Sequence, residues 1–374
     1  MRAIIAVIND IFTDQRVLKQ ESLLKELHFT VNIIGRRLKG STELPGSLLR
    51  NSRFKLLFRK GPGMYLAFNV RLFFFLLYTR ADLYIANDLD TLLPCFLISR
   101  LFRKPLIYDS HEYFTGQHGL AERRLKYYLW KCLEKRLIPR LKCMLTVSNS
   151  IADLYFNEYG IKPVVIRNLS PSSIAISARS RSELGIRKDE LLVVLQGSGI
   201  NPGRGVGELV EAMALTEGVR LLIIGGGDTL ENIRYLTALK GVTGKVTFLP
   251  RMPWEMMMSY TKCCDAGLSL DKDTCINQRY SLPNKLFDYI SAGIPVIASN
   301  LQEVAGIIND YGCGIILEDV KPDVIAAALR RLREDNALLI SLKSKAVSAS
   351  TVLNWENERR IELDLFRSVI YKNN

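Results

Sequence analysis

Residues 281–297, SLPNKLFDYISAGIPVI, predict a helix that is followed at once by a buried strand. Pro283 suits the first turn of the helix, because the missing N–H of proline would have no partner there. Gly293 suits the position just after the last helical residue. The apolar residues that follow are typical of a buried strand. Helices and buried strands in alternation predict a mainly parallel sheet with helices on both faces.

The start of the same helix has the features of an anion site. Free N–H groups at a helix start attract negative charge, and Lys285 adds an ammonium group, so we expect an anion such as a diphosphate there. Asp288 lies about one turn further on, where its carboxylate can accept hydrogen bonds from sugar hydroxyls. A diphosphate site beside a hydroxyl acceptor predicts a sugar nucleotide as the ligand.

The alternation of strands and helices extends along the whole chain. Before residue 168, apolar runs predict strands at 3–8, 30–34, 83–86, 106–108, 144–147 and 164–166. After residue 183, a second series predicts strands at 191–195, 220–224, 246–249, 266–270, 295–298 and 315–317. Amphipathic helical patterns separate them, among them 15–27, 91–101, 122–141, 148–159, 207–213, 229–239, 284–291 and 322–333.

A Ser-rich stretch, residues 168–183, divides the two series and predicts a linker. We therefore expect an α/β protein of two Rossmann-like, doubly wound domains, at 1–170 and 183–350. A tail helix within 355–374 is expected to pack back on the first domain. Ligands of such sheets bind beyond the carboxyl ends of the strands, so we expect them between the facing domains.

Composition restricts the partners. Of the 374 residues, 48% are hydrophobic, which excludes a disordered chain. The net charge of +13 indicates an anionic partner: a nucleic acid, an acidic membrane surface or a phosphorylated substrate. The aromatic and basic residues form no stacking motif for nucleic acid, so we expect none. Seven cysteines without a CxxC pair argue against a zinc site or a disulfide framework and fit reduced thiols in the cytoplasm.

The residues of several loops can be interpreted in two ways. The glycine-rich loop 196–205 with Arg204 is either a tight turn or a phosphate-binding loop. The three glycines at 225–227 allow either a turn or a ligand wall, and 249–253 is either a strand end or an edge that binds a base. His111, at the end of a predicted strand, is either structural or part of a site.

Acidic residues after two strands of the first domain also have two interpretations. Asp14 suits the cap of the helix that begins at Gln15, and Asp90 suits the cap of another helix. Arg16 is a candidate to bind an anion in the expected ligand site between the two domains.

Residues 53–80 mix apolar, aromatic and cationic side chains. This mixture suits either a segment that lies on anionic lipid or a core helix with a basic rim. Its fully apolar run, 72–78, is far shorter than the roughly 20 residues that cross a bilayer.

Taken together, these motifs resemble the retaining glycosyltransferases of family 4, of the bacterial surface-polysaccharide type, which have the GT-B fold. The resemblance covers most of the chain and is strongest over 191–317 and around Trp355. Residues 280–297 are similar to the family segment with two acidic residues eight positions apart, followed by small-x-Gly-x-Pro-Val. Tyr280 stands at the first acidic position, where Asp271, Asp273 or main-chain groups of 281–284 are candidates to substitute.

The resemblance implies roles for particular residues. Asp288 matches the ribose-binding acid, Arg204 the residue on the donor diphosphate, and His111 the histidine near the reacting centre. Lys285 is expected to supply the charge that is missing at Ser198, where the family often has arginine. We expect His111, Arg204 and Lys285 to be catalytic, and the donor to be bound by Gly197, Ser198, Arg251, Met252, Leu282, Asn284, Leu286 and Asp288.

The implied reaction moves a sugar from a UDP- or GDP-linked donor to an acceptor hydroxyl with retention. The acceptor is expected to be a saccharide or lipid-linked saccharide, at the inner face of a membrane with an anionic surface. No cofactor or metal is required. The first domain would hold the acceptor and the second the nucleotide sugar. A sugar-nucleotide epimerase of the same architecture and a non-catalytic degenerate transferase are the alternatives.

Overall fold

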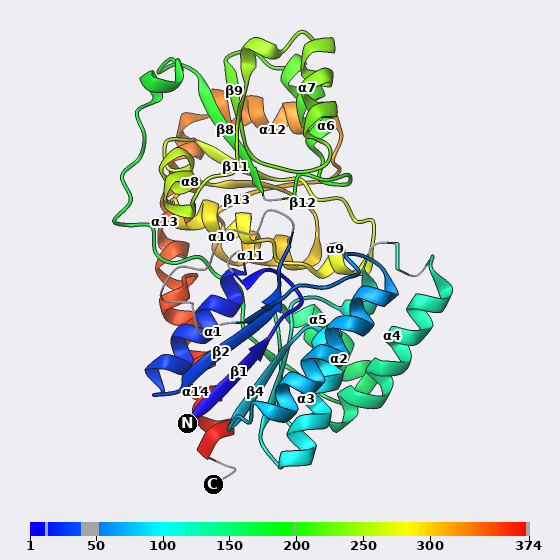
Figure 1. Cartoon of the computed structure of the whole chain (residues 1–374). Helices are drawn as coiled ribbons and strands as arrows, with labels where there is room; N and C mark the ends of the chain where they lie inside the picture. Colours follow the sequence, from blue (N-terminus) through cyan, green and yellow to red (C-terminus); the bar gives the residue numbers. More distant parts are fainter. Residues whose placement is uncertain (12–13, 39–51, 118, 121, 198, 372–374) are drawn as a thin grey trace. The chain divides into compact units, whose positions relative to one another are not determined.

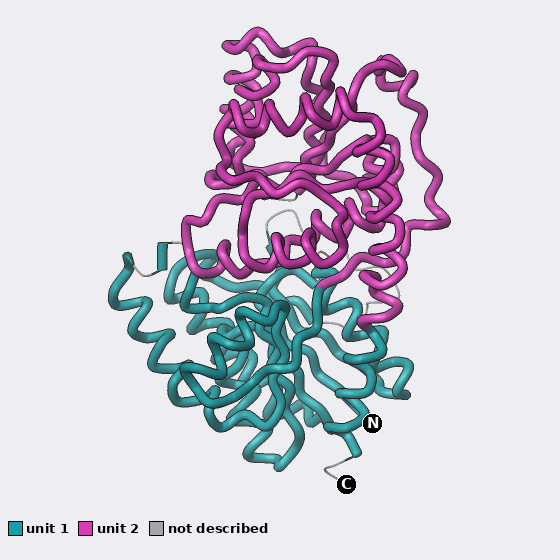
Figure 2. Tube along the Cα trace, turned by 180° about the vertical axis from the view of Figure 1, so that it is seen from behind, with its two compact units in different colours: residues 1–167, 359–374 teal, residues 168–358 magenta. Residues whose placement is uncertain are grey.

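The computed structural model of this chain describes residues 1–11, 14–38, 52–117, 119–120, 122–197 and 199–371. The chain forms two compact units, shown in Figure 2. Unit 1 consists of Met1–Arg167 and Arg359–Asn374, and unit 2 of Asn168–Glu358.

Unit 1 contains a seven-stranded sheet in the order β3-β2-β1-β4-β5-β6-β7, in which every paired strand is parallel. Its strands are β1 (Arg2–Ala6), β2 (Thr30–Arg36), β3 (Ser52–Phe54), β4 (Leu83–Asn87), β5 (Leu106–Ser110), β6 (Met144–Thr146) and β7 (Val164–Val165). Its helices are α1 (Gln15–Glu26), α2 (Pro62–Tyr78), α3 (Leu89–Phe102), α4 (Arg124–Leu137), α5 (Asn149–Tyr159) and most of α14 (Trp355–Tyr371), with 3₁₀ turns at Phe114–Gly116 and Ile138–Arg140 (Figure 1).

Unit 2 contains a six-stranded parallel sheet in the order β10-β9-β8-β11-β12-β13. Its strands are β8 (Leu191–Gly197), β9 (Val219–Gly225), β10 (Val246–Leu249), β11 (Ala266–Ser269), β12 (Val296–Ser299) and β13 (Gly314–Leu317). Its helices are α6 (Val206–Ala214), α7 (Leu230–Leu239), α8 (Trp254–Thr261), α9 (Ile276–Tyr280), α10 (Asn284–Ser291), α11 (Gln302–Tyr311), α12 (Pro322–Glu334) and α13 (Asn336–Val352), with 3₁₀ turns at Arg181–Leu184 and Thr243–Lys245.

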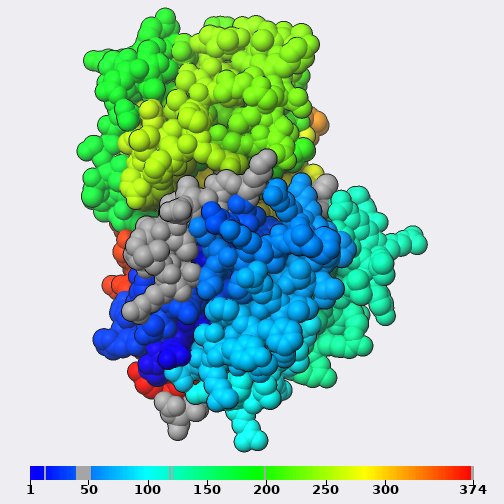
Figure 3. All heavy atoms as spheres, in the orientation of Figure 1, coloured from blue at the N-terminus to red at the C-terminus, as the bar shows by residue number. Residues whose placement is uncertain are grey.

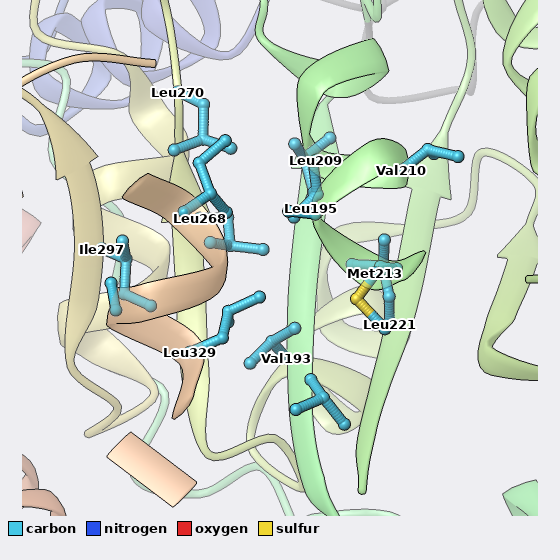
Figure 4. Close-up of a cluster of buried hydrophobic side chains, with 14 of the residues drawn as sticks. Val193, Leu195, Leu209, Val210, Met213, Leu221, Leu268, Leu270, Ile297 and Leu329 are labelled. Atoms are coloured by element: carbon cyan, nitrogen blue, oxygen red, sulfur yellow. The ribbon is translucent and has the colours of Figure 1, made fainter. Parts of the chain in front are cut away.

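Strand β8 illustrates why these apolar runs form the middle of a sheet. Side chains alternate between the two faces of a strand. Val193 and Leu195 accordingly pack with residues of α6 and α12 in one cluster, drawn in Figure 4, whereas Val194 packs with Leu286 of α10 in another. A sheet buried on both faces needs apolar side chains at odd and even positions alike. The predicted α/β class with two doubly wound sheets is therefore confirmed.

The tail helix α14 returns to unit 1, as the sequence predicts. At its start, the main-chain N–H of Trp355 donates to the carbonyl of Ser170 in unit 2. From Arg359 onward the helix belongs to unit 1, and its apolar stripe of Leu363, Phe366 and Ile370 is buried. The spacing of these three residues places them on one face of the helix.

Within the basic, apolar segment 53–80, the structure shows a helix that is partly buried in the core of unit 1. Residues 52–78 form the edge strand β3 and helix α2, which buries Met64, Phe68, Leu72 and Leu76 at every fourth position. Leu66, Phe74 and Tyr78 on the same helix are exposed. The helix is thus a core element on one side and carries an apolar surface on the other. Within the described part of the chain, no helix has the length and apolar character needed to cross a bilayer.

Candidate functional site

Two cations that the sequence analysis assigns to a diphosphate meet at one carboxylate in unit 2. Arg204 Nη1 lies 2.7 Å from Asp271 Oδ1, and Lys285 Nζ lies 3.0 Å from Asp271 Oδ2. Asp271 follows strand β11 and is buried, whereas the Arg204 side chain is 35% exposed. Burial opposes ionisation of Asp271, but Lys285 and Arg204 together hold its pKa below the ordinary value. The three groups therefore leave one net positive charge, with Arg204 open to a ligand.

The loop before α6 is held against the end of β11 by close backbone packing. Lys272 N donates to Gly203 O at 2.8 Å. Gly205, the N-cap of α6, has a φ of 67°, and a Cβ atom there would lie 2.5 Å from the carbonyl oxygen of Leu270. Only glycine fits this left-handed, crowded position. The glycine thus lets Arg204 reach Asp271.

Gly205→Ala is expected to destabilise unit 2 more than Gly241→Ala. Both glycines have a φ of +67°, but a Cβ atom at Gly241 meets nothing within 4 Å. Gly241→Ala should therefore lose only about 1–2 kcal/mol for the left-handed backbone. Gly205→Ala adds the clash with Leu270, for a total of about 2–5 kcal/mol. Urea unfolding measures both values, and equal losses would contradict the packing argument.

Asp288 is buried on α10 at the centre of a polar network. Its Oδ1 accepts hydrogen bonds from Ser170 Oγ at 2.5 Å and Trp254 Nε1 at 2.9 Å, and its Oδ2 accepts one from Gln196 Nε2 at 2.8 Å. Thr261 Oγ1 in turn donates to Gln196 Oε1 at 2.7 Å. A ribose hydroxyl at Asp288 would share the carboxylate with these protein donors.

The three partners of Asp288 were not predicted from the sequence. Ser170 belongs to the predicted linker, which is in fact packed on unit 2: Leu169 is fully buried and Ser173 Oγ donates to Ser291 O. Gln196 is the first residue of the glycine-rich loop 196–205, and its place there was a usable signal. Trp254 follows the 249–253 stretch, but nothing local marks its indole N–H as a partner for a carboxylate.

The other predicted donor-binding residues of unit 2 lie around the same strand ends. Gly197 ends β8, and its carbonyl accepts from Gly226 N at 3.3 Å. Arg251 is exposed, and its side chain covers Gly226 so closely that a Cβ atom there would lie 2.5 Å from Arg251 Nε. Met252 packs partly against the core. Ser198 lies outside the described residues.

Residues at the start of α10 differ in what they can offer a ligand. Leu282 and Leu286 are buried in the core of unit 2, so only their main-chain groups are available. Asn284 is exposed, and its Oδ1 accepts from Asn168 Nδ2 at 3.2 Å. Pro283 is the N-cap and makes no side-chain capping bond, so the helix N-terminus is uncapped by side chains. Tyr280, at the family's first acidic position, ends helix α9.

His111 lies in unit 1, directly after strand β5, among acidic and amide side chains. Its Nε2 is 2.9 Å from Asn87 Oδ1 and 3.6 Å from Asp109 Oδ2, and its Nδ1 is 3.5 Å from Asp88 Oδ2. The main-chain N–H of His111 donates to Asp88 Oδ1 at 2.9 Å. Burial alone would lower the pKa of His111, but Asp88 and Asp109 raise it to about 9. The imidazole is therefore a cation at neutral pH.

Two expectations about the neighbours of His111 are wrong. Arg16 does not face an anion site: it is buried and binds both carboxylate oxygens of Asp109, at 2.6 and 2.8 Å, and Ile166 O at 2.8 Å. A buried carboxylate needs such a partner, and that requirement outweighs exposure to a ligand. Asp90 is not the cap of α3, because the N-cap is Asp88, whose side chain is occupied by His111. Asp14 caps α1 as predicted, by accepting from Val17 N at 3.3 Å.

The raised pKa of His111 predicts a pH dependence of stability. A group whose pKa rises on folding stabilises the fold fully below its unfolded pKa of about 6.5 and loses that effect as the pH passes about 9. The free energy of unfolding should therefore fall between about pH 7 and 9.5. His111→Gln should flatten this fall relative to the wild type. Denaturant unfolding at both pH values measures the slope, and an unchanged slope in His111→Gln would contradict the assignment.

Among the described residues, no group of three or more His, Cys, Asp or Glu side chains is arranged to hold a metal ion.

Two family models match the chain. The model of "Glycosyl transferases group 1" matches residues 177–348, and that of "Glycosyltransferase Family 4" matches residues 21–169. The chain belongs to the family 4 glycosyltransferases of the GT-B fold. The first match contains Arg204, Asp271, Lys285 and Asp288, and the second contains His111.

Curated glycosyltransferases are similar to parts of the chain. An uncharacterized glycosyltransferase of Methanocaldococcus jannaschii is 22% identical over 252 residues, which are 64% of this chain and 62% of that protein. LpsD of Rhizobium meliloti, a lipopolysaccharide core biosynthesis glycosyltransferase, is 28% identical over 193 residues, 50% of this chain and 52% of that protein. The chain thus aligns with about half to three fifths of the length of these relatives.

Solved structures share the glycosyltransferase fold over the whole chain. Sucrose-phosphate synthase of Thermosynechococcus elongatus superposes with a TM-score of 0.80 at 16% identity, and the alignment covers 100% of both chains. HepE of Anabaena in complex with UDP and glucose superposes with a TM-score of 0.75 at 16% identity, over 98% of this chain and 100% of that one.

Proposed function

We propose that this chain transfers a sugar from a nucleotide-diphosphate sugar to an acceptor hydroxyl, with retention at the anomeric carbon. The observation that carries the proposal is the convergence of Arg204 and Lys285 on Asp271, beside the start of α10. The family membership supports the reaction class. The binding of UDP and glucose by HepE, a structure of the same fold, supports a nucleotide-sugar donor.

In this mechanism the cations stabilise the leaving group. The bond between the anomeric carbon and the diphosphate oxygen breaks, and the diphosphate leaves with the bonding electrons. Arg204, Lys285 and the N–H groups at the start of α10 stabilise the negative charge that develops there. Asp271 is a positioning residue, because its buried carboxylate pairs with both cations and fixes where they lie.

The acceptor attacks from the face that the diphosphate leaves. Its hydroxyl oxygen bonds to the anomeric carbon, and its proton passes to an oxygen of the departing diphosphate, so no protein nucleophile, general base or metal is required. We assign the ribose to Asp288, the base to the strand end at Arg251 and Met252, and the phosphates to main-chain groups of Gly197, Ser198, Leu282, Asn284 and Leu286. We place the protonated His111 near the donor sugar.

We further propose that the acceptor is a saccharide carried by a lipid, and that the protein binds an anionic membrane surface. Exposed apolar side chains lie on α2, which carries Arg71, and among the basic residues of α4; they include Leu66, Phe74, Leu125 and Tyr128. Figure 3 shows one face of unit 1, with the residues of α2 and α3 in blue to cyan. The net charge of +13 adds attraction to anionic lipid. LpsD, which acts in lipopolysaccharide core synthesis, supports a lipid-linked acceptor.

The reaction is tested by incubating the protein with UDP- and GDP-linked sugars and saccharide or lipid-linked saccharide acceptors. The expected product carries the sugar in the anomeric configuration of the donor, as read by NMR. An inverted product would overturn retention. An epimer of the donor that forms without acceptor would indicate an epimerase instead. Thermal shifts with UDP and GDP identify the base, since a ligand that binds only the folded state raises its stability.

The membrane proposal has its own test. Vesicles with anionic lipid should sediment the protein at low salt and release it at high salt, because screening weakens charge attraction. Vesicles of neutral lipid should bind it less. Equal sedimentation with both vesicle types, or none with either, would contradict the proposal.

A further inference from the structure

Unit 1 contains an apolar groove that the proposed reaction does not yet use. Its volume is about 780 Å³, within the range of small-molecule sites. Tyr65 and Leu66 of α2 line one side, and Leu129 and Trp130 of α4 line the other. Figure 1 shows these two helices next to each other in unit 1.

Aromatic side chains fix the floor of the groove. The Trp130 ring lies edge-on to Tyr65, with ring centroids 5.2 Å apart, and to Phe114, at 4.9 Å. These rings come from three separate elements, so the apolar floor is held by contacts within unit 1. The rim is apolar too, because Leu66 is 67% exposed and Leu129 is 58% exposed. On a soluble protein, a contiguous exposed apolar surface often marks a binding site.

Cations line the groove where α4 begins. Arg123, the N-cap of α4, and Lys126 one turn along both contribute to the lining, together with a single carboxylate from Glu122. Among the described residues, neither Arg123 nor Lys126 forms an ion pair, and Arg123 makes no side-chain cap of the helix. Two cations and a helix N-terminus favour an anionic group at this end. The groove is thus apolar along its body and cationic at one end.

The groove adjoins the carboxyl end of strand β5, directly after which His111 lies. Asn69, which lines the groove, donates to Asp90 O at 2.8 Å, and Asp90 lies two residues after Asp88, the partner of His111. Gln117 also lines the groove and contacts Glu112, the residue after His111. A ligand in the groove would therefore extend toward His111.

We propose that this groove binds the prenyl chain of a prenyl-phosphate-linked acceptor, with its phosphate on Arg123 and Lys126. A prenyl phosphate is a single unsaturated chain with one anionic end, which matches both the aromatic floor and the position of the cations. The assignment of this ligand as acceptor rests on the proposed transferase function. The groove also accounts for the exposure of Leu66 on α2 and Leu129 on α4.

The test measures binding of farnesyl phosphate, below the concentration at which it forms micelles, by calorimetry without donor. Leu66→Glu and Leu129→Glu should weaken binding about tenfold or more, because each places a charge on the apolar wall. Leu239→Glu is the matched control, since Leu239 is 66% exposed on α7 of unit 2. Arg123→Gln with Lys126→Gln should reduce the affinity for farnesyl phosphate to that for farnesol. Inorganic phosphate alone should bind far more weakly than farnesyl phosphate.

The outcomes separate this inference from the proposed reaction. Farnesyl phosphate binding that Leu66→Glu and Leu129→Glu weaken supports the groove, even if no sugar is transferred to any acceptor. No binding, or equal binding by wild type and both variants, overturns the groove even if transfer to a soluble saccharide is intact. Loss of binding in Leu239→Glu as well would overturn it, because the effect would then be general. Association of the chain with itself through this face, detected by light scattering and abolished by Leu129→Glu, would replace the lipid by a second copy.

Discussion

Arg204→Ala and Lys285→Ala are each expected to lower sugar transfer by about 10²–10³-fold, while the protein stays folded. Either change removes one of the two cations at Asp271, so the cluster loses its net positive charge. The loss should fall mainly on kcat, because the charge of the leaving diphosphate is greatest in the transition state. Steady-state kinetics with a saturating acceptor measure it.

A matched control is available on the same unit. Arg187 precedes strand β8 and pairs with Asp189 at 3.2 Å, and both side chains are exposed. Arg187→Ala should leave kcat near that of the wild type. Arg204→Lys, which keeps the charge but not the planar fork, should recover only part of the activity. Near-normal turnover in both alanine variants would refute the mechanism, provided that circular dichroism shows an intact fold.

Arg16→Ala is expected to destabilise unit 1 by about 3–5 kcal/mol, because the buried carboxylate of Asp109 loses its two short bonds to a cation and keeps only Gln20 and the His111 ring, which lies 3.6 Å away. Arg16 and Asp109 expose 7% and 0% of their side chains, so water cannot replace the lost bonds. Urea unfolding measures the loss. It can be followed through Trp130 of unit 1 in a background where Trp254 and Trp355 are phenylalanine.

The contrast for this prediction is an ion pair of the same unit that is open to water. Lys104 Nζ lies 2.9 Å from Asp82 Oδ1, and both side chains are more than 40% exposed. Lys104→Ala should destabilise unit 1 by less than about 1 kcal/mol. Similar losses for Arg16→Ala and Lys104→Ala would show that the Arg16 pair is not an essential part of the core.

The sheets were predictable because their signal is local. A run such as 191–195 is apolar at every position, and that alone predicts a strand buried on both faces. The helix at 284–291 was equally well marked, since proline precedes it and Gly293 follows one residue after its C-cap, Ala292. Each of these features requires only residues that are neighbours in the sequence.

The surroundings of the candidate site were not predictable in the same way. Ser170 Oγ reaches Asp288 across 118 positions of sequence, and Arg204 reaches Asp271 across 67. No periodicity encodes such pairs, because they arise only when strands of one sheet bring their ends together. Arg16 was misjudged for the same reason: its partner Asp109 is 93 residues away.

Which face of helix α2 is buried could not be predicted from its sequence. Phe73, Phe74 and Phe75 are consecutive, so hydropathy does not distinguish the buried face from the exposed one. The structure buries Phe68 and Leu72, and it leaves Phe74 at the surface. The choice depends on what α2 packs against, which the pattern of its own residues does not contain.

The path of helix α14 has a consequence for how the chain is made. Unit 1 consists of two pieces of chain with all of unit 2 between them, and Phe366 and Ile370 of the second piece are buried in it. On the ribosome, Arg16 and Asp109 emerge early, whereas Glu362, which is buried near them, emerges only after residue 358. Unit 2 is continuous and can complete its fold first. Synthesis therefore finishes the second unit before the first, the reverse of the usual N-to-C order of domain folding.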